Sequence, residues 1–417
     1  MTDMACIAAP SVTETVLSSD RDFVLTPNPA AGPGAWTAAQ DAVLSDAAFA
    51  EARATITAWP GYRPTPLVAL PGVARAAGIA ALHYKDEASR FGLGSFKALG
   101  GAYAVWKVLL RTAAAKGIDP NDRAAFAAHA GTLTVTCATD GNHGRSVAWG
   151  ARTFGCPCVI FIHAGVSEGR KAEIERYGAR VVRSTGNYDD SVREAQAAAT
   201  REGWIVVSDT SYEGYTDIPK DVMQGYELMA AEALDQWPEA ELPTHLFLQT
   251  GVGGMAAAVA AHFVRRFGTA RPEIVLADPL KSACWLESIR AGHPVAVEGD
   301  LDTMMAGLAC GEVSGLAWTV LEPLADAVVG LADDAAIDGM RLLAEGRFGD
   351  APLVAGESAV AGLAALMAVA GDAAARAALK LGLEARVLVF GTEGATDPVL
   401  WERLVGRSPA SVGGRCG

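Results

Sequence analysis

Residues 133–163 read LTVTCATDGNHGRSVAWGARTFGCPCVIFIH, and this stretch decides the fold. A β-rich run at 133–139 is followed by a turn, a helix-length segment at 142–154 and a second β-rich run at 157–163. Short runs rich in Val and Ile that alternate with helix-length segments are typical of parallel strands joined by crossover helices. The stretch therefore predicts an α/β fold.

The same alternation continues on both sides of this stretch. Further strands are predicted at 81–86, 180–184, 204–209, 245–249, 273–278 and 386–390, and further helices at 45–58, 96–110, 168–178, 189–201, 217–237 and 256–267. The helix at 217–237 divides the strands into two series, which predicts two lobes, each with a largely parallel twisted sheet flanked by helices.

The small α/β lobe is predicted at 106–212, inserted into a large lobe made of residues 1–105 and 213–417. The first sixty or so residues contain Pro27, Pro29 and Pro33 and are predicted to wrap irregularly around the molecule. Ligands of such sheets bind beyond the carboxyl ends of the strands. The site is therefore expected in the cleft between the lobes.

Composition limits the partners of this chain of 417 residues. Its net charge of −14 repels phosphate backbones and anionic lipids, so neither nucleic acid nor a membrane is expected as a partner. The N-terminus has no basic cluster before its apolar stretch and does not resemble a secretory signal. The apolar run at 359–371 is too short to span a bilayer and predicts a packed core helix.

Seven cysteines are spread sparsely along the chain, and none form pairs at zinc-binding spacing. They are interpreted as small buried hydrophobic residues in a reducing cytoplasm, and no metal site is predicted.

Lys97 lies in the segment RFGLGSFKALGGAY at 90–103, at the start of an apolar helix. Apolar surroundings lower the pKa of a lysine and favour the neutral amine that attacks an aldehyde. The alternative is a solvated lysine at a helix start, although a positive charge is unfavourable at a helix N-terminus.

The turn TDGNHG at 139–144 places polar side chains between a predicted strand and a predicted helix. Asn142 is a candidate to hydrogen-bond a ring hydroxyl or a carboxylate. Asp140 is either a helix N-cap or a base that reaches the same site. His143 is interpreted as structural. Asp209 ends another predicted strand, where a carboxylate either faces the ligand crevice or caps a turn.

The segment QTGVGGM at 249–255 is a glycine loop between a β-run and a helix, where amide groups and the helix dipole suit a phosphate. The same residues, read as Gly251-x-Gly253-x-x-Ala256 with Asp278 after the next strand, match a dinucleotide-binding fingerprint. These residues alone leave both interpretations open, but nothing after Asp278 offers a catalytic His or Arg pair for a nicotinamide enzyme.

Lys97, the Asp140 turn, the Gly251–Gly254 loop and Thr392 occur in the order seen in fold-type II pyridoxal-phosphate enzymes, the group of the tryptophan synthase β chain and threonine dehydratase. Within that group, the sequence resembles the diaminopropionate ammonia-lyases from about residue 60 to residue 400. The motifs that carry this resemblance are YRPTPL at 62–67, KDE at 85–87, TDGNHGR at 139–145, NYDD at 187–190, EGY at 213–215, AGLACGE at 306–312 and GTEG at 391–394. Serine and threonine dehydratases carry Ser where Asp140 stands.

The resemblance implies a homodimeric enzyme with pyridoxal 5'-phosphate, bound in the large lobe. It implies that Lys97 forms the Schiff base with the cofactor, and that Lys97 and Asp140 are bases on opposite faces of it, with Asp209 near the departing amino group. The cofactor-binding residues that it implies, besides Lys97, are Phe96, Asn142, Gly251, Val252, Gly253, Gly254, Met255 and Thr392. The implied reaction removes ammonia from D- or L-2,3-diaminopropionate and gives pyruvate and two ammonia.

Three other functions are compatible with parts of the sequence. They are a pyridoxal-phosphate serine/threonine or hydroxyaspartate dehydratase, a non-catalytic amino-acid sensor, and an NAD-dependent oxidoreductase that uses the Gly251 loop.

Two details depart from or extend the family pattern. Gly94 and Ser95 stand where the family is expected to have Asn and Ala, on the side of the substrate carboxylate, so they bear on substrate range. The resemblance also places Cys284 and Cys310 on loops of the large lobe, where two reduced thiols are expected and a disulfide between them is the alternative.

Overall fold

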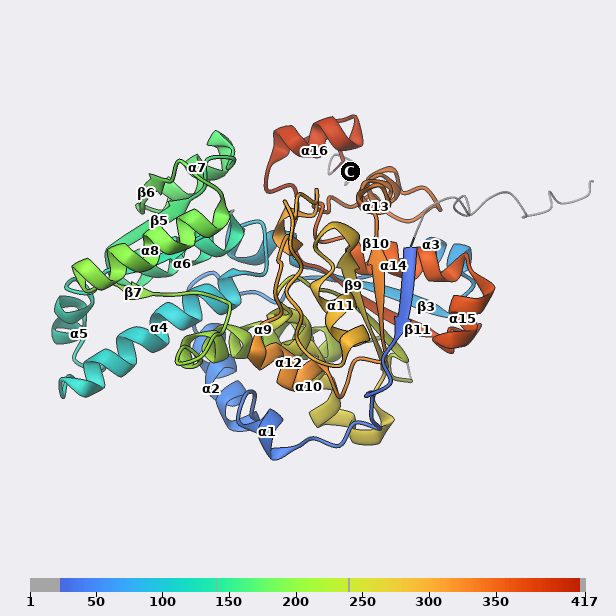
Figure 1. Cartoon of the computed structure of the whole chain (residues 1–417), viewed down its shortest axis with the longest axis horizontal. Coiled ribbons are helices and arrows are strands. Elements are labelled where there is room, and N and C mark those ends of the chain that lie inside the picture. The colour runs from blue at the N-terminus through green and yellow to red at the C-terminus, as the bar shows by residue number, and fades with distance from the viewer. Residues whose placement is uncertain (1–22, 140, 239–240, 413–417) are drawn as a thin grey trace, which may run out of the picture.

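A computed structural model of the chain describes residues 23–139, 141–238 and 241–412, which form two β-sheets flanked by helices (Figure 1). The larger sheet has seven strands in the order β1-β10-β9-β8-β11-β3-β2. Their bounds are β1 Phe23–Pro27, β2 Leu67–Ala69, β3 Ala81–Asp86, β8 His245–Gln249, β9 Glu273–Pro279, β10 Ala327–Leu331 and β11 Arg386–Gly391.

The central strands of this sheet are parallel, and only the edge strands β1 and β2 are antiparallel to their neighbours. Strands β8 and β10 are buried along their whole length, as expected where helices cover both faces of a parallel sheet. Because β8, β9 and β11 run in the same direction, the loops that follow them meet at one edge of the sheet.

The smaller sheet has four parallel strands in the order β6-β5-β4-β7. Their bounds are β4 Val135–Ala138, β5 Cys158–Ile162, β6 Arg180–Arg183 and β7 Ile205–Val206. Helices α6 (Asn142–Phe154) and α8 (Tyr188–Glu202) pack against β4 and β5. Glycine ends α6 and α8 at Gly155 and Gly203, both in the left-handed conformation that favours glycine.

Helices α4 (Ala98–Ala115) and α9 (Asp217–Asp235) pack side by side between the two sheets, with α6 on the other side of α4. Small residues on α4 permit this close packing. A Cβ at Gly100 would lie 2.4 Å from Cε1 of Tyr226 on α9, and a Cβ at Gly101 would lie 1.9 Å from Oγ of Ser146 on α6. The lobe boundary predicted between residues 105 and 106 falls inside α4, and the division into lobes stays a prediction.

The remaining helices surround these sheets. They are α1 Ala38–Asp41, α2 Asp46–Thr57, α3 Pro71–Ala77, α5 Arg123–Ala130, α7 Glu168–Glu175, α10 Gly254–Phe267, α11 Cys284–Ala291, α12 Gly315–Leu321, α13 Asp333–Glu345, α14 Ala361–Ala370, α15 Ala373–Ala378 and α16 Pro398–Val405. Within the described ranges, no helix combines the length and the apolar character needed to cross a membrane.

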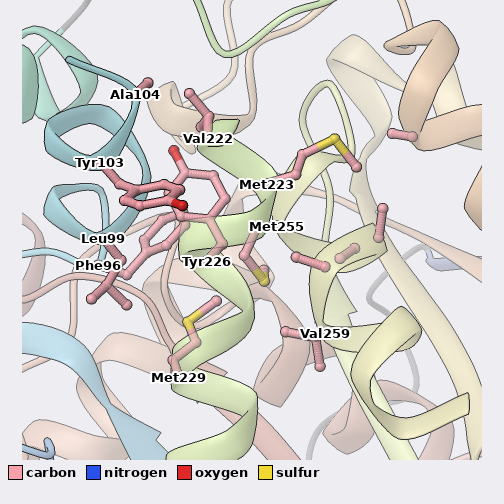
Figure 2. Packing of buried hydrophobic residues seen from close by; sticks show 14 of the residues in the cluster. Phe96, Leu99, Tyr103, Ala104, Val222, Met223, Tyr226, Met229, Met255 and Val259 are labelled. Carbon is pink, nitrogen blue, oxygen red and sulfur yellow. The ribbon is translucent and has the colours of Figure 1, made fainter. Parts of the chain in front are cut away.

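The hydrophobic core lies on both faces of the larger sheet. Alternate residues of β8 enter different clusters: Leu246 and Leu248 pack with α9 and α10, and Phe247 packs with α14. Figure 2 shows the first of these clusters where Phe96 at the start of α4 meets Tyr226 and Met229 on α9 and Met255 on α10.

Most predicted elements are confirmed, several with the bounds expected, such as 81–86, 142–154 and 245–249. The apolar run at 359–371 contains the buried helix α14, as predicted. Two predictions were wrong. The N-terminal wrap is not entirely irregular, since β1 joins the edge of the larger sheet. The strand predicted at 204–209 is limited to Ile205–Val206, because the Tyr215 hydroxyl binds the Val206 carbonyl and the Ser208 amide and starts a loop there.

Candidate active site

Lys97 and Asp209 meet between the two sheets. Lys97 immediately precedes α4, and Asp209 lies three residues after β7 of the smaller sheet. The Lys97 ammonium Nζ lies 2.6 Å from Asp209 Oδ2. It also lies 5.3 Å from the ring centre of Phe96 and 5.6 Å from that of Tyr226. A lysine and a carboxylate far apart in the chain therefore form one ion pair beside two aromatic rings.

The electrostatics of this pair differ from the expectation for Lys97. Burial alone lowers the pKa of the Lys97 amine, but Asp209 outweighs burial and holds that pKa above its ordinary value. Burial raises the pKa of Asp209, but His143 and Lys97 outweigh burial and lower that pKa below its ordinary value, so the carboxylate stays ionised. The prediction that apolar surroundings depress the pKa of Lys97 was wrong, because the sequence does not reveal the carboxylate that faces the amine.

His143, which the sequence indicated as structural, is part of the same group. Its Nδ1 lies 3.7 Å from Asp209 Oδ2, and its Nε2 hydrogen-bonds the Val207 carbonyl at 2.8 Å. The imidazole thus lies between the end of the smaller sheet and the carboxylate. A histidine three residues after the catalytic candidate Asp140 was the available sequence signal, but the spacing alone did not connect it to Asp209.

The glycine loop at 250–255 connects β8 to α10. Gly253 has φ of +97°, and a Cβ there would lie 2.2 Å from Cζ2 of Trp285. The backbone amides of residues 251–255 donate hydrogen bonds to no acceptor among the described residues, and no N-cap side chain binds the first turn of α10. Unsatisfied amides at a helix N-terminus are the donor set that holds a phosphate. The loop therefore fits the phosphate of a cofactor.

Asp278 excludes the dinucleotide interpretation of this loop. Its buried carboxylate accepts hydrogen bonds from the amides of Trp285 at 3.0 Å and Leu286 at 3.1 Å, at the start of α11. Burial raises the pKa of Asp278 to about 8. The indole Nε1 of Trp285 also donates to the Gly251 carbonyl at 3.0 Å. The carboxylate that would bind the ribose of a dinucleotide therefore already binds two backbone amides of the protein.

Two loops of the larger sheet pair beside Lys97. The Phe96 amide donates to the Thr392 carbonyl at 3.0 Å, and the Gly394 amide donates to the Gly94 carbonyl at 2.9 Å. The hydroxyl of Thr392 accepts a hydrogen bond from Gln249 Nε2 at 2.9 Å. The loop carrying Lys97 is thereby held against the turn that follows β11.

Asn142, the first residue of α6, reaches this turn from the smaller sheet. Its side-chain amide donates a short hydrogen bond to the Glu393 carboxylate. Sequence analysis did not single out Glu393, although it directly follows Thr392 in the GTEG motif. The glycine loop is close as well, since a Cβ at Gly254 would lie 3.9 Å from the Asp209 carbonyl oxygen.

Asp140 lies outside the described residues, and its two possible roles stay predictions. The Thr139 hydroxyl accepts hydrogen bonds from the amides of Gly141 and Gly144, both at 3.1 Å. Thr139 therefore satisfies one amide in the first turn of α6, whose N-cap residue is Gly141.

Gly94 has φ of +79°, a region that glycine adopts freely and that asparagine tolerates better than most residues. The same backbone conformation therefore accommodates both the glycine found at position 94 and the asparagine expected there. A Cβ at Gly94 would lie 3.4 Å from Nη1 of Arg145, which donates to the Leu93 carbonyl at 2.7 Å.

Cys284 and Cys310 are both reduced thiols, so the disulfide that was the alternative to this expectation does not form. Cys284 is a buried reduced thiol, and its sulfur lies 3.7 Å from the Gly251 carbonyl, to which it donates. Burial raises the pKa of this thiol. Its sulfur is engaged with the glycine loop and forms no bond to Cys310.

Comparisons with known proteins agree with this geometry. The family model "Pyridoxal-phosphate dependent enzyme" matches residues 58–392. The diaminopropionate ammonia-lyase of Salmonella typhimurium is 38% identical over 84% of this chain and 90% of its own length. The holo form of diaminopropionate ammonia lyase from Escherichia coli superposes with a TM-score of 0.83 at 36% identity, covering 92% of this chain and 97% of that one. The same enzyme has been solved with an aminoacrylate-PLP azomethine reaction intermediate, with equal TM-score and coverage.

The glycine loop, the lysine and the carboxylate thus occur in a chain that matches these enzymes over most of its length. The chain belongs to the pyridoxal-phosphate dependent enzymes, within the group of the diaminopropionate ammonia-lyases.

Proposed function

We propose that this chain eliminates ammonia from 2,3-diaminopropionate, with pyridoxal phosphate as cofactor, and yields pyruvate and two ammonia. The observation that carries the proposal is the Lys97–Asp209 pair at 2.6 Å, next to a glycine loop with unsatisfied amides. The relatives of the same length and fold that bear this name support the choice of substrate.

The residues divide into groups that hold the cofactor and groups that move protons. Lys97 attaches the cofactor, and the amides of residues 251–255 bind its phosphate. Asn142 would hydrogen-bond the ring hydroxyl, and Phe96 lies beside the lysine. Because Gln249 donates to the Thr392 hydroxyl, that hydroxyl would be free to donate its own proton to a ring nitrogen of the bound cofactor, which would then stay unprotonated. The bound cofactor supplies an electron sink for a carbanion at the substrate α-carbon.

Two bases remove the α-proton of the two enantiomers in this proposal. Lys97 takes the proton of one enantiomer, and Asp140 takes that of the other from the opposite side.

Asp209 distinguishes this function from the dehydratase alternative. A diamine substrate brings a second ammonium group into the site, and a carboxylate kept ionised by its surroundings balances that charge. Serine and threonine bring no such cation. Asp209 is therefore proposed to face the departing β-amino group.

The decisive experiment compares turnover of D- and L-diaminopropionate with turnover of serine and threonine. Lys97→Ala should lose both the absorbance of the bound cofactor and turnover. Asp140→Asn should reduce turnover of the D-isomer by about 10²–10⁴-fold, and that of the L-isomer much less. Faster turnover of serine than of diaminopropionate would favour a dehydratase. An unchanged ratio of D- to L-turnover in Asp140→Asn would eliminate the two-base assignment.

We further propose that residues 106–212 form the small domain, that residues 1–105 and 213–417 form the cofactor-binding domain, and that the enzyme acts as a cytoplasmic homodimer. The origin of all four strands of the smaller sheet between residues 135 and 206 supports the division. The burial of reduced thiols such as Cys137 and Cys284 supports a reducing compartment.

A further inference from the structure

We propose that Glu393 is a positioning residue that orients the Asn142 amide toward the cofactor and links the two sheets at the site. The inference rests on the proposed function of Asn142 as a cofactor ligand. It concerns a side chain that is 5% exposed and that reaches from the larger sheet to the first turn of α6.

Both carboxylate oxygens of Glu393 have partners. Oε2 accepts the hydrogen bond from Asn142 Nδ2 and lies 3.5 Å from the Thr396 hydroxyl. Oε1 accepts from the Ser358 amide at 3.2 Å. The side chain is also confined by packing, since a Cβ at Gly356 would lie 2.8 Å from Cγ of Glu393. Glu393 therefore has little freedom to leave Asn142.

The backbone of Glu393 is tied to the lysine loop at the same time. Glu393 and Ser95 form an antiparallel bridge, flanked by the hydrogen bonds from Phe96 to Thr392 and from Gly394 to Gly94. Lys97 is two residues from this bridge. Glu393 thus sets the position of Asn142 at the start of α6 relative to Lys97 at the start of α4.

The chemistry of the two side chains sets the orientation of the amide. An ionised carboxylate only accepts hydrogen bonds, whereas an asparagine amide has a donor end and an acceptor end. Glu393 therefore selects the donor end of Asn142, which leaves the second N–H of the amide for an acceptor such as a ring oxygen. A glutamine at position 393 would itself donate to the Asn142 carbonyl, and the preference would be lost.

The test uses E393Q, with D397N as a matched control. Asp397 also joins the two sheets, since it accepts from the Ser167 hydroxyl at 3.0 Å, and Asn would still cap α16. The measurements are the equilibrium affinity of the apoprotein for pyridoxal phosphate and the absorbance maximum of the bound cofactor. We expect E393Q to bind pyridoxal phosphate roughly tenfold more weakly, with a shifted maximum, and D397N to match the wild type in both.

N142A and the double variant E393Q/N142A complete the test, and they keep it valid if E393Q alone is poorly folded. If Glu393 acts through Asn142, the double variant should resemble N142A, so that the effects are not additive. Wild-type affinity and absorbance in E393Q, or additive effects in the double variant, would overturn the inference. If the wild type itself fails to bind pyridoxal phosphate, the proposed function fails instead, and the two failures are distinguishable.

Discussion

The charge of Lys97 depends on Asp209 more than on burial. The carboxylate holds the amine in its ammonium form, yet the amine must lose a proton before it attacks an aldehyde. Asp209 thus determines the pH at which the lysine becomes a nucleophile.

Asp209→Asn should lower the pKa of Lys97, because burial then acts without the opposing carboxylate. The measurement is the rate at which pyridoxal phosphate attaches to the apoprotein as a function of pH. We expect the midpoint of that profile to move to lower pH. Asp221→Asn is the control, because Asp221 is paired with Arg111 at 2.5 Å. An unmoved midpoint in Asp209→Asn would contradict the assignment.

Gly253 is required by its backbone and by its neighbour. A side chain at φ of +97° is strained, and its Cβ would collide with Trp285, which holds the Gly251 carbonyl. Gly253→Val should therefore weaken binding of pyridoxal phosphate, measured by titration of the apoprotein. Gly268→Val tests strain alone, since Gly268 at the end of α10 has φ of +54° and open space around its Cβ. Equal affinities in the two variants would place the phosphate elsewhere.

At the scale of elements, a buried ion network anchors the loop that carries Lys97. Arg90 hydrogen-bonds both Glu87, on the 3₁₀ turn Glu87–Gly92, and Glu232 on α9. Lys85 on β3 also binds Glu232, at 2.8 Å. Burial raises the pKa of Glu232, but Arg90 and Lys85 outweigh it and the net pKa is lowered. The charges of two cations and two carboxylates therefore neutralise one another in a region that is buried from solvent.

Removing one member of this network should be costly, because an unpaired charge stays buried. Glu232→Gln should lower the free energy of unfolding by about 3–5 kcal/mol, measured by urea denaturation. The matched control is Asp235→Ala on the same helix, which breaks the exposed pair with Arg53 and should cost no more than about 1 kcal/mol. Since the pKa of Glu232 is lowered on folding, its contribution is present at neutral pH and is lost as pH falls. A similar loss of unfolding free energy in both variants would mean that the buried network stabilises the fold no more than an exposed ion pair does.

At the scale of the whole molecule, a few polar contacts join the two sheets across the site. Arg170 of α7 binds Glu357 at 3.0 Å, and Ser167 binds Asp397. Burial and the nearby Glu393 raise the pKa of Glu357 to about 7, although Arg170 opposes them. The charge of Glu357, and with it the contact between Glu357 and Arg170, therefore changes with pH near neutrality.

The sign of the pH effect follows from the direction of the shift. The ordinary pKa of the Glu357 carboxyl is 4.5, so the unfolded chain loses this proton before the folded chain does as pH rises. The contribution of Glu357 to stability is thus full below pH 4.5 and is lost as pH rises through 7. The unfolding free energy of the wild type, relative to Glu357→Gln, should fall by roughly 3 kcal/mol between about pH 4 and about pH 8. Parallel pH profiles for the two proteins would contradict the raised pKa.

The sequence by itself determined the local structure and the family to which the chain belongs. Strand and helix periods are properties of short segments, so the helix at 142–154 and the strands at 81–86 and 245–249 were predicted with their observed bounds. The glycine loop was also recognisable, because an anion site at a helix N-terminus is built from consecutive residues.

Tertiary structure decided the features that depend on residues distant in the chain. The edge strand β1 forms because it pairs with β10, about 300 residues later in the chain. Residues 23–27 carry no sequence signal that identifies β10 as their partner. The pKa of Lys97 rises because Asp209, 112 positions away, lies 2.6 Å from it. Asn142 and Glu393 are 251 positions apart. Electrostatic and hydrogen-bonding energies depend on distance in space, and folding sets that distance when it brings the two sheets together.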